Sequence, residues 1–223
     1  MKSKLPWTAL KQAQTLDGKI ALSDKNSKWI TSEESRKEVH KLRDIFDAVL
    51  VGANTVIKDN PKLTVRNVSE GRNPVRIIID PNLNTQPSSS VYEDNSKIVL
   101  FTLKGHPVKR INEYLKVNKN IQVIELNKVS ENKFDLKELF AKTGEMNILS
   151  ILIESGPLLS GELIKEKLLD EYYLFISPKI FGDINSLPSV LTGPLGKIAD
   201  SFEFTISDHC IIGNDLMLRL KTS

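Results

Sequence analysis

Two places in the sequence combine residue types that suit anionic ligands. The first is the stretch from Asp47 to Arg66, in which the apolar run 48–51 ends at Gly52 and small residues follow at 53–55. A strand that leads through small residues into a helix exposes backbone N–H groups, which suit a phosphate. The guanidinium of Arg66 could bind a second anion through two parallel hydrogen bonds. An ordinary strand–helix connection has the same pattern, so both interpretations stay open.

The second place follows the apolar run 148–153. Glu154 comes directly after this predicted strand, at the edge where α/β sheets usually bind ligands, although a carboxylate there could equally cap the next helix. Gly156, Ser160 and Gly161 are small enough to let a diphosphate approach the backbone. The dinucleotide fingerprint G-x-G-x-x-G is absent from the sequence.

Short apolar runs and helical spacings predict the elements that must position these residues. We expect strands at residues 7–14, 20–22, 48–51, 75–80, 98–101, 121–126, 148–153 and 170–176, with helices after 52 and at 108–115, 134–141 and 158–167. The strands 202–206 and 211–220 should pair as an antiparallel hairpin through residues 207–214. The predicted fold class is therefore α/β, with a mostly parallel central sheet flanked by helices and an antiparallel C-terminal hairpin.

One further helix has a clear start signal. Thr31 and Glu34 match the capping box, in which each side chain bonds an orphan backbone N–H. The apolar residues Val39, Leu42, Ile45 and Phe46 should form its buried face. Arg43 lies near the end of this helix, where it could simply interact with the helix dipole. Residues 82–95, rich in Asn, Pro and Ser, should be an exposed loop.

Composition narrows the class of protein. The 223 residues are 40% hydrophobic and 26% charged, so we expect one globular domain over 1–223. A net charge of +3 is too small to indicate a nucleic-acid partner. Without an 18-residue apolar run or a signal sequence, we expect no membrane partner and a cytoplasmic location. The three histidines lack metal-ligand spacing, so no metal is expected, and Cys210 should be a buried structural thiol.

Several motifs in this order resemble the reductase domain of riboflavin biosynthesis. They run through nearly the whole chain, from about Pro6 to Leu220, and comprise Leu10-Lys11, residues 15–19, 27–31, Arg43, 52–61, 63–66, 73–80, 154–157 and 177–182. The resemblance implies a dihydrofolate-reductase-like fold that uses NADPH. It further implies reduction of the ribosyl group of 5-amino-6-(5-phosphoribosylamino)uracil to the ribityl form.

The resemblance also implies roles for individual residues. The cofactor would be held by Ala13, Trp29, Thr55, Asp59 and the turn made by Gly156, Pro157, Leu158, Leu159, Ser160, Gly161 and Glu162. The substrate would be held by Ser27, Arg43, Leu63, Arg66 and Glu154, with Lys11 beside the reacting sugar. Lys11 and Glu154 would be the catalytic residues. Arg43 and Arg66 suit the 5′-phosphate because guanidinium groups are permanently charged bidentate donors.

Two features depart from the family pattern. Relatives usually carry a zinc deaminase domain with a His/Cys signature, and its absence predicts a stand-alone reductase or a separated domain, with a separate deaminase as a pathway partner. Pro81 follows Asp80 where the family often has a serine that reaches the cofactor, which puts that contact in doubt.

Other functions compete with this assignment. The nearest alternative is reduction of the non-deaminated 2,5-diamino-6-ribosylamino-pyrimidinone 5′-phosphate. Residues 29–31 and 154–157 look more like the bacterial, uracil-type pattern of the family, and this resemblance favours the deaminated substrate. A dihydrofolate reductase is disfavoured by Arg43 and Arg66, because folate carries no phosphate. A non-catalytic nucleotide-binding subunit is a third alternative. By resemblance, we expect a homodimer.

Overall fold

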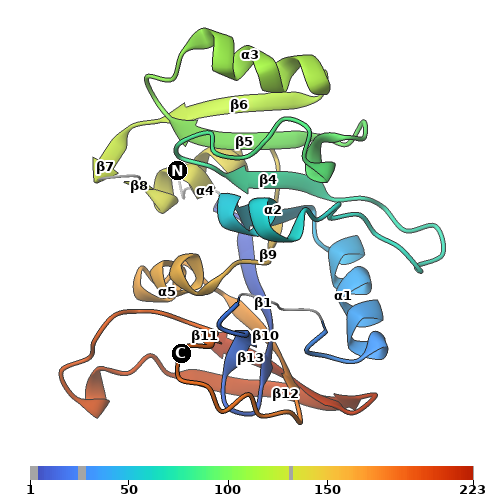
Figure 1. The fold of residues 1–223 in the computed structure, drawn as a ribbon, viewed down its shortest axis with the longest axis vertical. Coiled ribbons are helices and arrows are strands. Elements are labelled where there is room, and N and C mark those ends of the chain that lie inside the picture. The colour runs from blue at the N-terminus through green and yellow to red at the C-terminus, as the bar shows by residue number, and fades with distance from the viewer. Residues whose placement is uncertain (1–4, 25–28, 131–132, 223) are drawn as a thin grey trace. The chain divides into compact units, whose positions relative to one another are not determined.

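The computed structural model describes residues 5–24, 29–130 and 133–222, and these form two compact units (Figure 1). Unit 1 combines Met1–Trp7 with His40–Ile153, and unit 2 combines Thr8–Val39 with Glu154–Ser223. Neither unit is therefore a continuous stretch of the sequence. Helix α1 (Glu33–Ile45) contributes its first part to unit 2 and its last part to unit 1.

Unit 1 is built on a parallel sheet. Its strands, in spatial order, are β9 (Ser150–Ile153), β3 (Ala48–Gly52), β4 (Val75–Ile79), β5 (Ile98–Leu103) and β6 (Ile121–Leu126). Each neighbouring pair is parallel. All six side chains of β5 are buried, which explains why this strand has a continuous apolar sequence.

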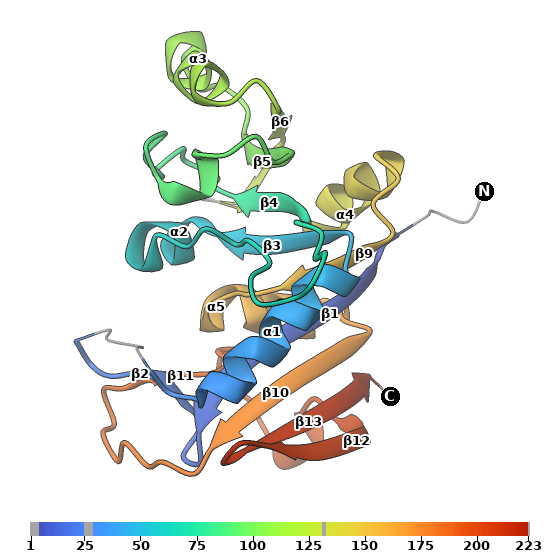
Figure 2. The ribbon, with the colours of Figure 1, turned by 90° about the vertical axis from the view of Figure 1, so that its right-hand side faces the viewer.

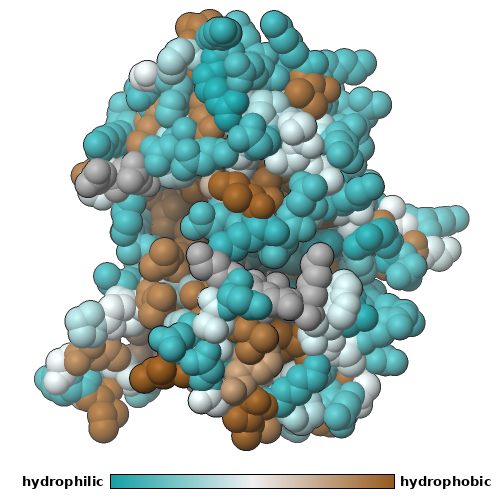
Figure 3. Space-filling model, viewed as in Figure 1, coloured by the Kyte–Doolittle hydropathy of each residue, from teal (hydrophilic) through white to brown (hydrophobic). Residues whose placement is uncertain are grey.

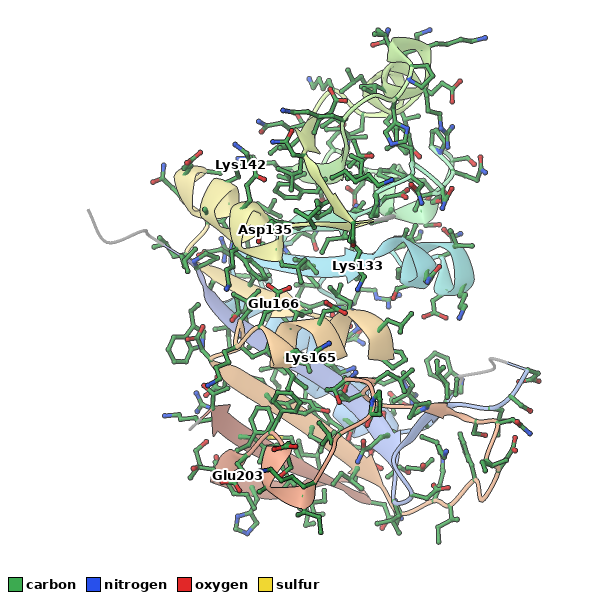
Figure 4. All side chains as sticks on the ribbon, turned by 90° about the vertical axis from the view of Figure 1, so that its left-hand side faces the viewer. Lys133, Asp135, Lys142, Lys165, Glu166 and Glu203 are labelled. Atoms are coloured by element: carbon green, nitrogen blue, oxygen red, sulfur yellow. The ribbon has the colours of Figure 1, made fainter. Side chains whose placement is uncertain are left out.

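Helices and a long loop complete unit 1. Its helices are α2 (Ala53–Asp59), α3 (Val108–Val117), α4 (Leu136–Glu145) and the 3₁₀ turn η1 (Ser90–Tyr92), and β7 (Lys128–Ser130) pairs with β8 (Lys133–Phe134). Asp135 caps α4 by accepting a hydrogen bond from the backbone N–H of Lys137 at 2.8 Å, and Figure 4 labels it at the start of that helix. The main core cluster comprises Val49, Val51, Val56, Leu63, Ile78, Leu83, Val91, Tyr92, Ile98, Leu100, Tyr114 and Ile121.

Unit 2 has a mixed sheet, visible in the lower part of Figure 2. Its strands, in spatial order, are β12 (Phe204–Ile212), β13 (Asp215–Thr222), β10 (Glu171–Ser177) and β1 (Trp7–Thr15). β1 and β10 are parallel, whereas β10–β13 and β12–β13 are antiparallel. Helix α5 (Pro157–Lys165), the short pair β2 (Lys19–Ala21) with β11 (Leu187–Pro188), and the 3₁₀ turn η2 (Ile198–Asp200) complete the unit.

These observations confirm the predicted fold class, including the mostly parallel sheet and the antiparallel C-terminal hairpin. The boundaries of the hairpin were predicted wrongly. Residues 207–210, expected in the connection, and residues 211–212, expected at the start of the second strand, belong to β12, and the turn is confined to Gly213 and Asn214. Gly213 has a φ of 60°, a conformation that glycine adopts without strain.

The prediction for Cys210 was wrong, because the thiol is exposed. An apolar run indicates a strand but does not show what covers that strand. Most side chains of β12 are exposed, since this strand lies at the edge of the unit 2 sheet.

The start and the buried face of α1 also differ from the prediction. Ser32, not Thr31, caps the helix, since its Oγ accepts a hydrogen bond from the N–H of Ser35 at 3.2 Å. The reason is tertiary: Asp215 accepts hydrogen bonds from the Ser32 N–H at 2.7 Å and from Ser35 Oγ at 2.6 Å. Burial raises the pKa of Asp215, but these hydrogen bonds outweigh it and lower the pKa below its usual value. Ile45 is 71% exposed and does not belong to the buried face.

The loop after β4 is anchored in the interior of unit 1, contrary to the expectation of an exposed loop. Asp80 is fully buried and accepts hydrogen bonds from the N–H and the hydroxyl of Thr85, both at 2.8 Å. The Thr85 hydroxyl also lies 2.9 Å from the hydroxyl of Tyr92. Composition suggested an exposed loop because it cannot reveal these buried polar contacts.

Apolar side chains remain exposed on the long segment of unit 2 between β11 and β12. Ile198 on this segment is 92% exposed, and Ile184, which precedes β11, is 90% exposed. Figure 3 shows brown side chains at its lower left, where Figure 1 draws the segment between β11 and β12. Among the described residues, no helix has the length and apolar character needed to cross a membrane.

Candidate functional site

In unit 1, the turn after β3 joins the strand directly to α2. Gly52 ends the strand and is the N-cap of α2, and no side chain caps the helix. Thr55 is half-buried in this helix, and Asp59 is exposed at its end. Asn60 then adopts a left-handed conformation with φ of 42°, and the helix stops there, directly before Pro61.

The segment after α2 places Leu63 and Arg66. Leu63 is 3% exposed, belongs to the unit 1 core and has a φ of 53°. A positive φ is unusual for a residue other than glycine, and such residues are enriched at functional sites. The side chain of Arg66 is exposed and makes no hydrogen bond or ion pair with another residue in the described part of the chain.

Two residues of α1 hold this segment. Arg43 Nη1 donates a hydrogen bond to the carbonyl oxygen of Thr64 at 3.2 Å, so Arg43 positions the backbone between Leu63 and Arg66. His40 Nδ1 lies 3.1 Å from the same carbonyl and accepts from the N–H of Arg66 at 3.2 Å. The role of His40 was missed in the sequence, where the histidines were considered only as metal ligands. Its spacing of three residues from Arg43, on one helix face, could have revealed it.

In unit 2, Lys11 and Ala13 lie on one face of β1. They are in register with Tyr173 and Phe175 of β10, and Lys11 Nζ lies 5.8 Å from the ring centroid of Phe175. Both residues are half-buried. The Phe175 ring next to the ammonium group gives it a partly apolar surrounding.

The N-terminal turn of α5 has the backbone geometry expected for a phosphate. Gly156 is the N-cap, no side chain caps the helix, and Pro157 is at its start. The first intrahelical hydrogen bond runs from the N–H of Ser160 to the carbonyl of Gly156 at 3.1 Å, so the N–H groups of Leu158 and Leu159 precede the helical ladder. Apart from Gly156 and its two neighbours in the chain, no described residue has an atom within 4 Å of the position of a Cβ on Gly156.

Gly161 has a packing role in addition to the cofactor role predicted for it. A Cβ at this position would collide with the backbone carbonyl of Leu191 and would also come close to the backbone nitrogen of Thr192. The N–H of Leu191 donates to the carbonyl of Pro157 at 3.0 Å. The small residue therefore lets another protein segment pack on α5, whereas the space next to Gly156 is open.

The remaining predicted site residues are Trp29, Glu154, Glu162 and Ser27, and the described ones differ in their exposure and contacts. Trp29 is 65% exposed, and the guanidinium of Arg36 lies 4.3 Å from its ring centroid. Lys179 Nζ donates to the carbonyls of Trp29 at 2.9 Å and Ile30 at 2.7 Å, so it fixes the backbone beside the tryptophan. Glu154 and Glu162 are half-buried. Ser27 lies outside the described residues.

The carboxylate of Asp17 connects the motif at residues 15–19 with the motif at residues 177–182. Asp17 accepts hydrogen bonds from the Thr15 hydroxyl, from the N–H of Phe181 at 3.2 Å and from the N–H of Gly182 at 2.9 Å. The hydrogen bond from Thr15, followed by those from Gly182 and Phe181, lowers the pKa of Asp17 to about 2. This links the 15–19 turn to the 177–182 turn.

The predicted residues thus fall into two sets. Unit 1 holds Thr55, Asp59, Arg43, Leu63 and Arg66, and the last three are brought together around the Thr64 carbonyl. Unit 2 holds Lys11, Ala13, Trp29, Glu154 and the 156–162 turn. Among the described residues, no group of three or more His, Cys, Asp or Glu side chains is arranged to hold a metal ion.

Pro81, the position that departs from the family pattern, has a structural role in unit 1. Its carbonyl accepts hydrogen bonds from the N–H of Leu103 and the hydroxyl of Thr102, both at 3.1 Å. His106 Nε2 lies 2.9 Å from the same oxygen. The backbone carbonyl makes these contacts, so they do not depend on which side chain stands at position 81.

This arrangement of strands and helices belongs to the dihydrofolate-reductase class of folds. Dihydrofolate reductase from Enterococcus faecalis, solved as a complex with NADP(H), has a TM-score of 0.53 at 12% identity over 97% of this chain and 96% of its own. A deaminase/5-amino-6-(5-phosphoribosylamino)uracil reductase from Thermotoga maritima has a TM-score of 0.80 at 32% identity, over 99% of this chain and 57% of its own.

The chain belongs to the family described as the RibD C-terminal domain, which matches residues 6–218. The riboflavin biosynthesis protein RibD of Aquifex aeolicus is 40% identical over 97% of this chain and 58% of its own length. The 2,5-diamino-6-ribosylamino-4(3H)-pyrimidinone 5′-phosphate reductase of Methanothermobacter thermautotrophicus is 32% identical over 96% of both chains. These matches confirm the family resemblance seen in the sequence. The chain spans somewhat more than half the length of most curated relatives that it matches.

Proposed function

We propose that this chain is an oxidoreductase of riboflavin biosynthesis that uses NADPH to reduce the ribosyl group of 5-amino-6-(5-phosphoribosylamino)uracil to the ribityl form. The observation that carries the proposal is the likeness, over 99% of the chain, to the Thermotoga maritima protein whose name includes this reductase activity. A fold alone does not define a substrate, so the residues of each unit must also suit the chemistry.

The N-terminal turn of α5 suits the diphosphate of a nicotinamide dinucleotide. The N–H groups of Leu158 and Leu159 precede the helical ladder, and the space next to Gly156 is open among the described residues. A helix N-terminus with these features favours a phosphate through hydrogen bonds and the helix dipole. Ala13, Trp29, Thr55 and Asp59 complete the proposed cofactor residues.

Arg66 supports the assignment of a phosphorylated substrate. Its exposed guanidinium can bind the 5′-phosphate with two parallel hydrogen bonds, while Arg43 and His40 hold the backbone beside it. Leu63, buried with a positive φ, fixes the direction in which this segment leaves the core. Ser27 is proposed as a substrate residue on the family resemblance alone.

The reaction adds a hydride to C1′ of the open-chain imine and a proton to its nitrogen. When bound, the nicotinamide supplies the hydride. We assign the protein mainly the task of alignment, which can remove several kcal/mol of the barrier, ~7 or more when the geometry is good. Glu154 would bind the sugar hydroxyls, and Lys11 would donate a hydrogen bond or a proton near the reacting nitrogen.

The test is NADPH oxidation, followed by absorbance, with the deaminated and the diamino pyrimidine supplied separately to the purified protein. Turnover of the uracil compound alone is the expected result. Turnover of the diamino compound alone would show that the substrate assignment is wrong. NADPH binding without oxidation of either would instead support a nucleotide-binding subunit.

The diamino substrate is the second candidate because of one specific observation. The Methanothermobacter thermautotrophicus relative, matched over 96% of both chains, is named for that substrate. The two candidates place the deamination on opposite sides of this step: a uracil substrate requires deamination before the reduction, and a diamino substrate requires deamination after it. The two-substrate assay distinguishes them directly.

The proposal includes a homodimer in the cytoplasm. Within each chain, units 1 and 2 would constitute one reductase domain over residues 1–223. Ile206 and Ile211 on β12 are 60% and 70% exposed, and edge strands with apolar side chains are usually paired or covered. Light scattering should therefore give twice the chain mass of 25.1 kDa. A single cooperative unfolding transition is expected, whereas two separated transitions would contradict the single domain.

A further inference from the structure

Gln12 is a buried polar residue between two proposed site residues. Its exposure is 4%, and it lies on β1 between Lys11 and Ala13. Side chains alternate along a strand, so Gln12 points to the face opposite Lys11 and Ala13. The face that carries Gln12 is the one whose side chains reach α5, as its contact with Ser160 shows.

The amide of Gln12 is hydrogen-bonded at both ends. Nε2 donates to the carbonyl of Ser189 at 2.7 Å, to Ser160 Oγ at 2.9 Å and to the carbonyl of Ser155 at 3.3 Å. Oε1 accepts from the hydroxyl of Tyr172 at 2.6 Å. Two backbone carbonyls and one tyrosine hydroxyl define which end of the amide is which, since only an NH₂ group can donate to the carbonyls.

These partners surround the N-terminal turn of α5. Ser155 and Ser160 flank the Gly156–Leu159 backbone, and their hydroxyls lie 2.9 Å apart. Ser189 belongs to the segment that continues to Leu191, whose N–H bonds the carbonyl of Pro157. One side chain of β1 therefore fixes both the turn and the segment that packs on α5 at Gly161.

We propose that Gln12 is a positioning residue that holds the Ser155–Ser160 turn in the arrangement that binds the diphosphate of the nicotinamide dinucleotide. The inference rests on the proposed function, since it concerns the same cofactor. A buried amide is costly unless its partners are present, and an apolar side chain of similar volume would pack here without needing them. The hydrogen bonds, rather than the volume, give this position its role.

Two variants test the proposal without touching the cofactor residues. Gln12→Met keeps the length of the side chain but removes all four hydrogen bonds, and Tyr172→Phe removes only the hydroxyl that donates to Oε1. The matched control is Gln14→Met, because Gln14 is the same residue type on the same face of β1 and takes part in none of these bonds.

The measurements are the NADPH dissociation constant, by fluorescence titration, together with kcat and the melting temperature. We expect the dissociation constant to rise about tenfold in Gln12→Met and about threefold in Tyr172→Phe, as losses of buried hydrogen bonds predict. At saturating NADPH, kcat should stay within about twofold of the wild type, because the chemistry is performed by other residues. Gln14→Met should bind like the wild type.

Each alternative outcome has a definite meaning. A lower melting temperature with an unchanged dissociation constant would show that Gln12 only supports packing, and would overturn the inference. If Gln12→Met does not fold, Tyr172→Phe decides alone by the same criterion. A folded wild type that does not bind NADPH would overturn the proposed function and this inference with it, whereas a wild type that binds together with unaffected variants would overturn the inference only.

Discussion

Replacing Gly161 with alanine should destabilise the protein, although alanine is the better helix former. The new Cβ would collide with the backbone of Leu191 and Thr192, and backbone atoms cannot move aside as the end of a long side chain can. Overpacking of this kind costs ~1–3 kcal/mol. Displacing the segment also breaks the hydrogen bond from Leu191 to Pro157, which contributes ~1 kcal/mol. The higher helix propensity of alanine adds ~1 kcal/mol of stability, so the free energy of unfolding should fall by ~1–3 kcal/mol in total.

Urea unfolding of the wild type and of Gly161→Ala measures this difference directly. The matched control is Gly196→Ala in the same unit, where the only described neighbour of the new Cβ is Asp200 Oδ2 at 3.5 Å, an ordinary contact. We expect the control to change the free energy of unfolding by less than ~0.5 kcal/mol. If Gly161→Ala is as stable as the control or more stable, the close packing of the Leu191 segment on α5 is wrong.

Three other substitutions test separate parts of the two units. Arg66→Ala should raise the KM for the pyrimidine substrate ~10-fold to 100-fold through the loss of charged hydrogen bonds to its phosphate, with the KM for NADPH unchanged; a similar rise in the exposed control Lys62→Ala would contradict a specific role of Arg66. Leu63→Ala should lower the free energy of unfolding by ~2–5 kcal/mol, because Leu63 is 3% exposed in the core, and a loss below ~1 kcal/mol in urea unfolding would contradict this. Asp17 has its pKa lowered in the folded state to about 2, so its ionised form stabilises the fold above the unfolded pKa of ~3.9 and this contribution is lost as pH falls towards 2. The melting temperature of the wild type should therefore exceed that of Asp17→Asn at neutral pH and converge with it near pH 2, and a difference independent of pH would refute the assignment.

The strands were predictable because a strand buried on both faces has a run of consecutive apolar residues. The runs at 48–51 and 98–101 are apolar without alternation, as expected for parallel strands covered on both faces, and both became central strands of unit 1. The errors came from contacts between residues far apart in the sequence. Asp215, 180 or more residues from Ser35 and Ser32, decided which residue caps α1.

The site was predictable mainly through the family resemblance rather than through residue chemistry. Arg66 and the Gly156 turn could be suggested from residue type and position, because guanidinium groups and helix N-termini suit anions anywhere. Gln12 could not, because the role of a lone amide depends on the backbone groups around it, and for His40 the sequence offered only its spacing of three residues from Arg43. The carbonyl of Leu191 likewise gives Gly161 its role, and no local pattern shows that contact.

The division of the chain between the two units determines the order in which they can form during synthesis. Residues 40–153, which make up nearly all of unit 1, leave the ribosome as one continuous stretch. Residues 8–39 are made earlier, but β10, the parallel partner of β1 in unit 2, begins only at Glu171. Contacts between such distant residues form slowly because a long loop must close first. The N-terminal strand of unit 2 is therefore made long before β10, while the sheet of unit 1 is completed.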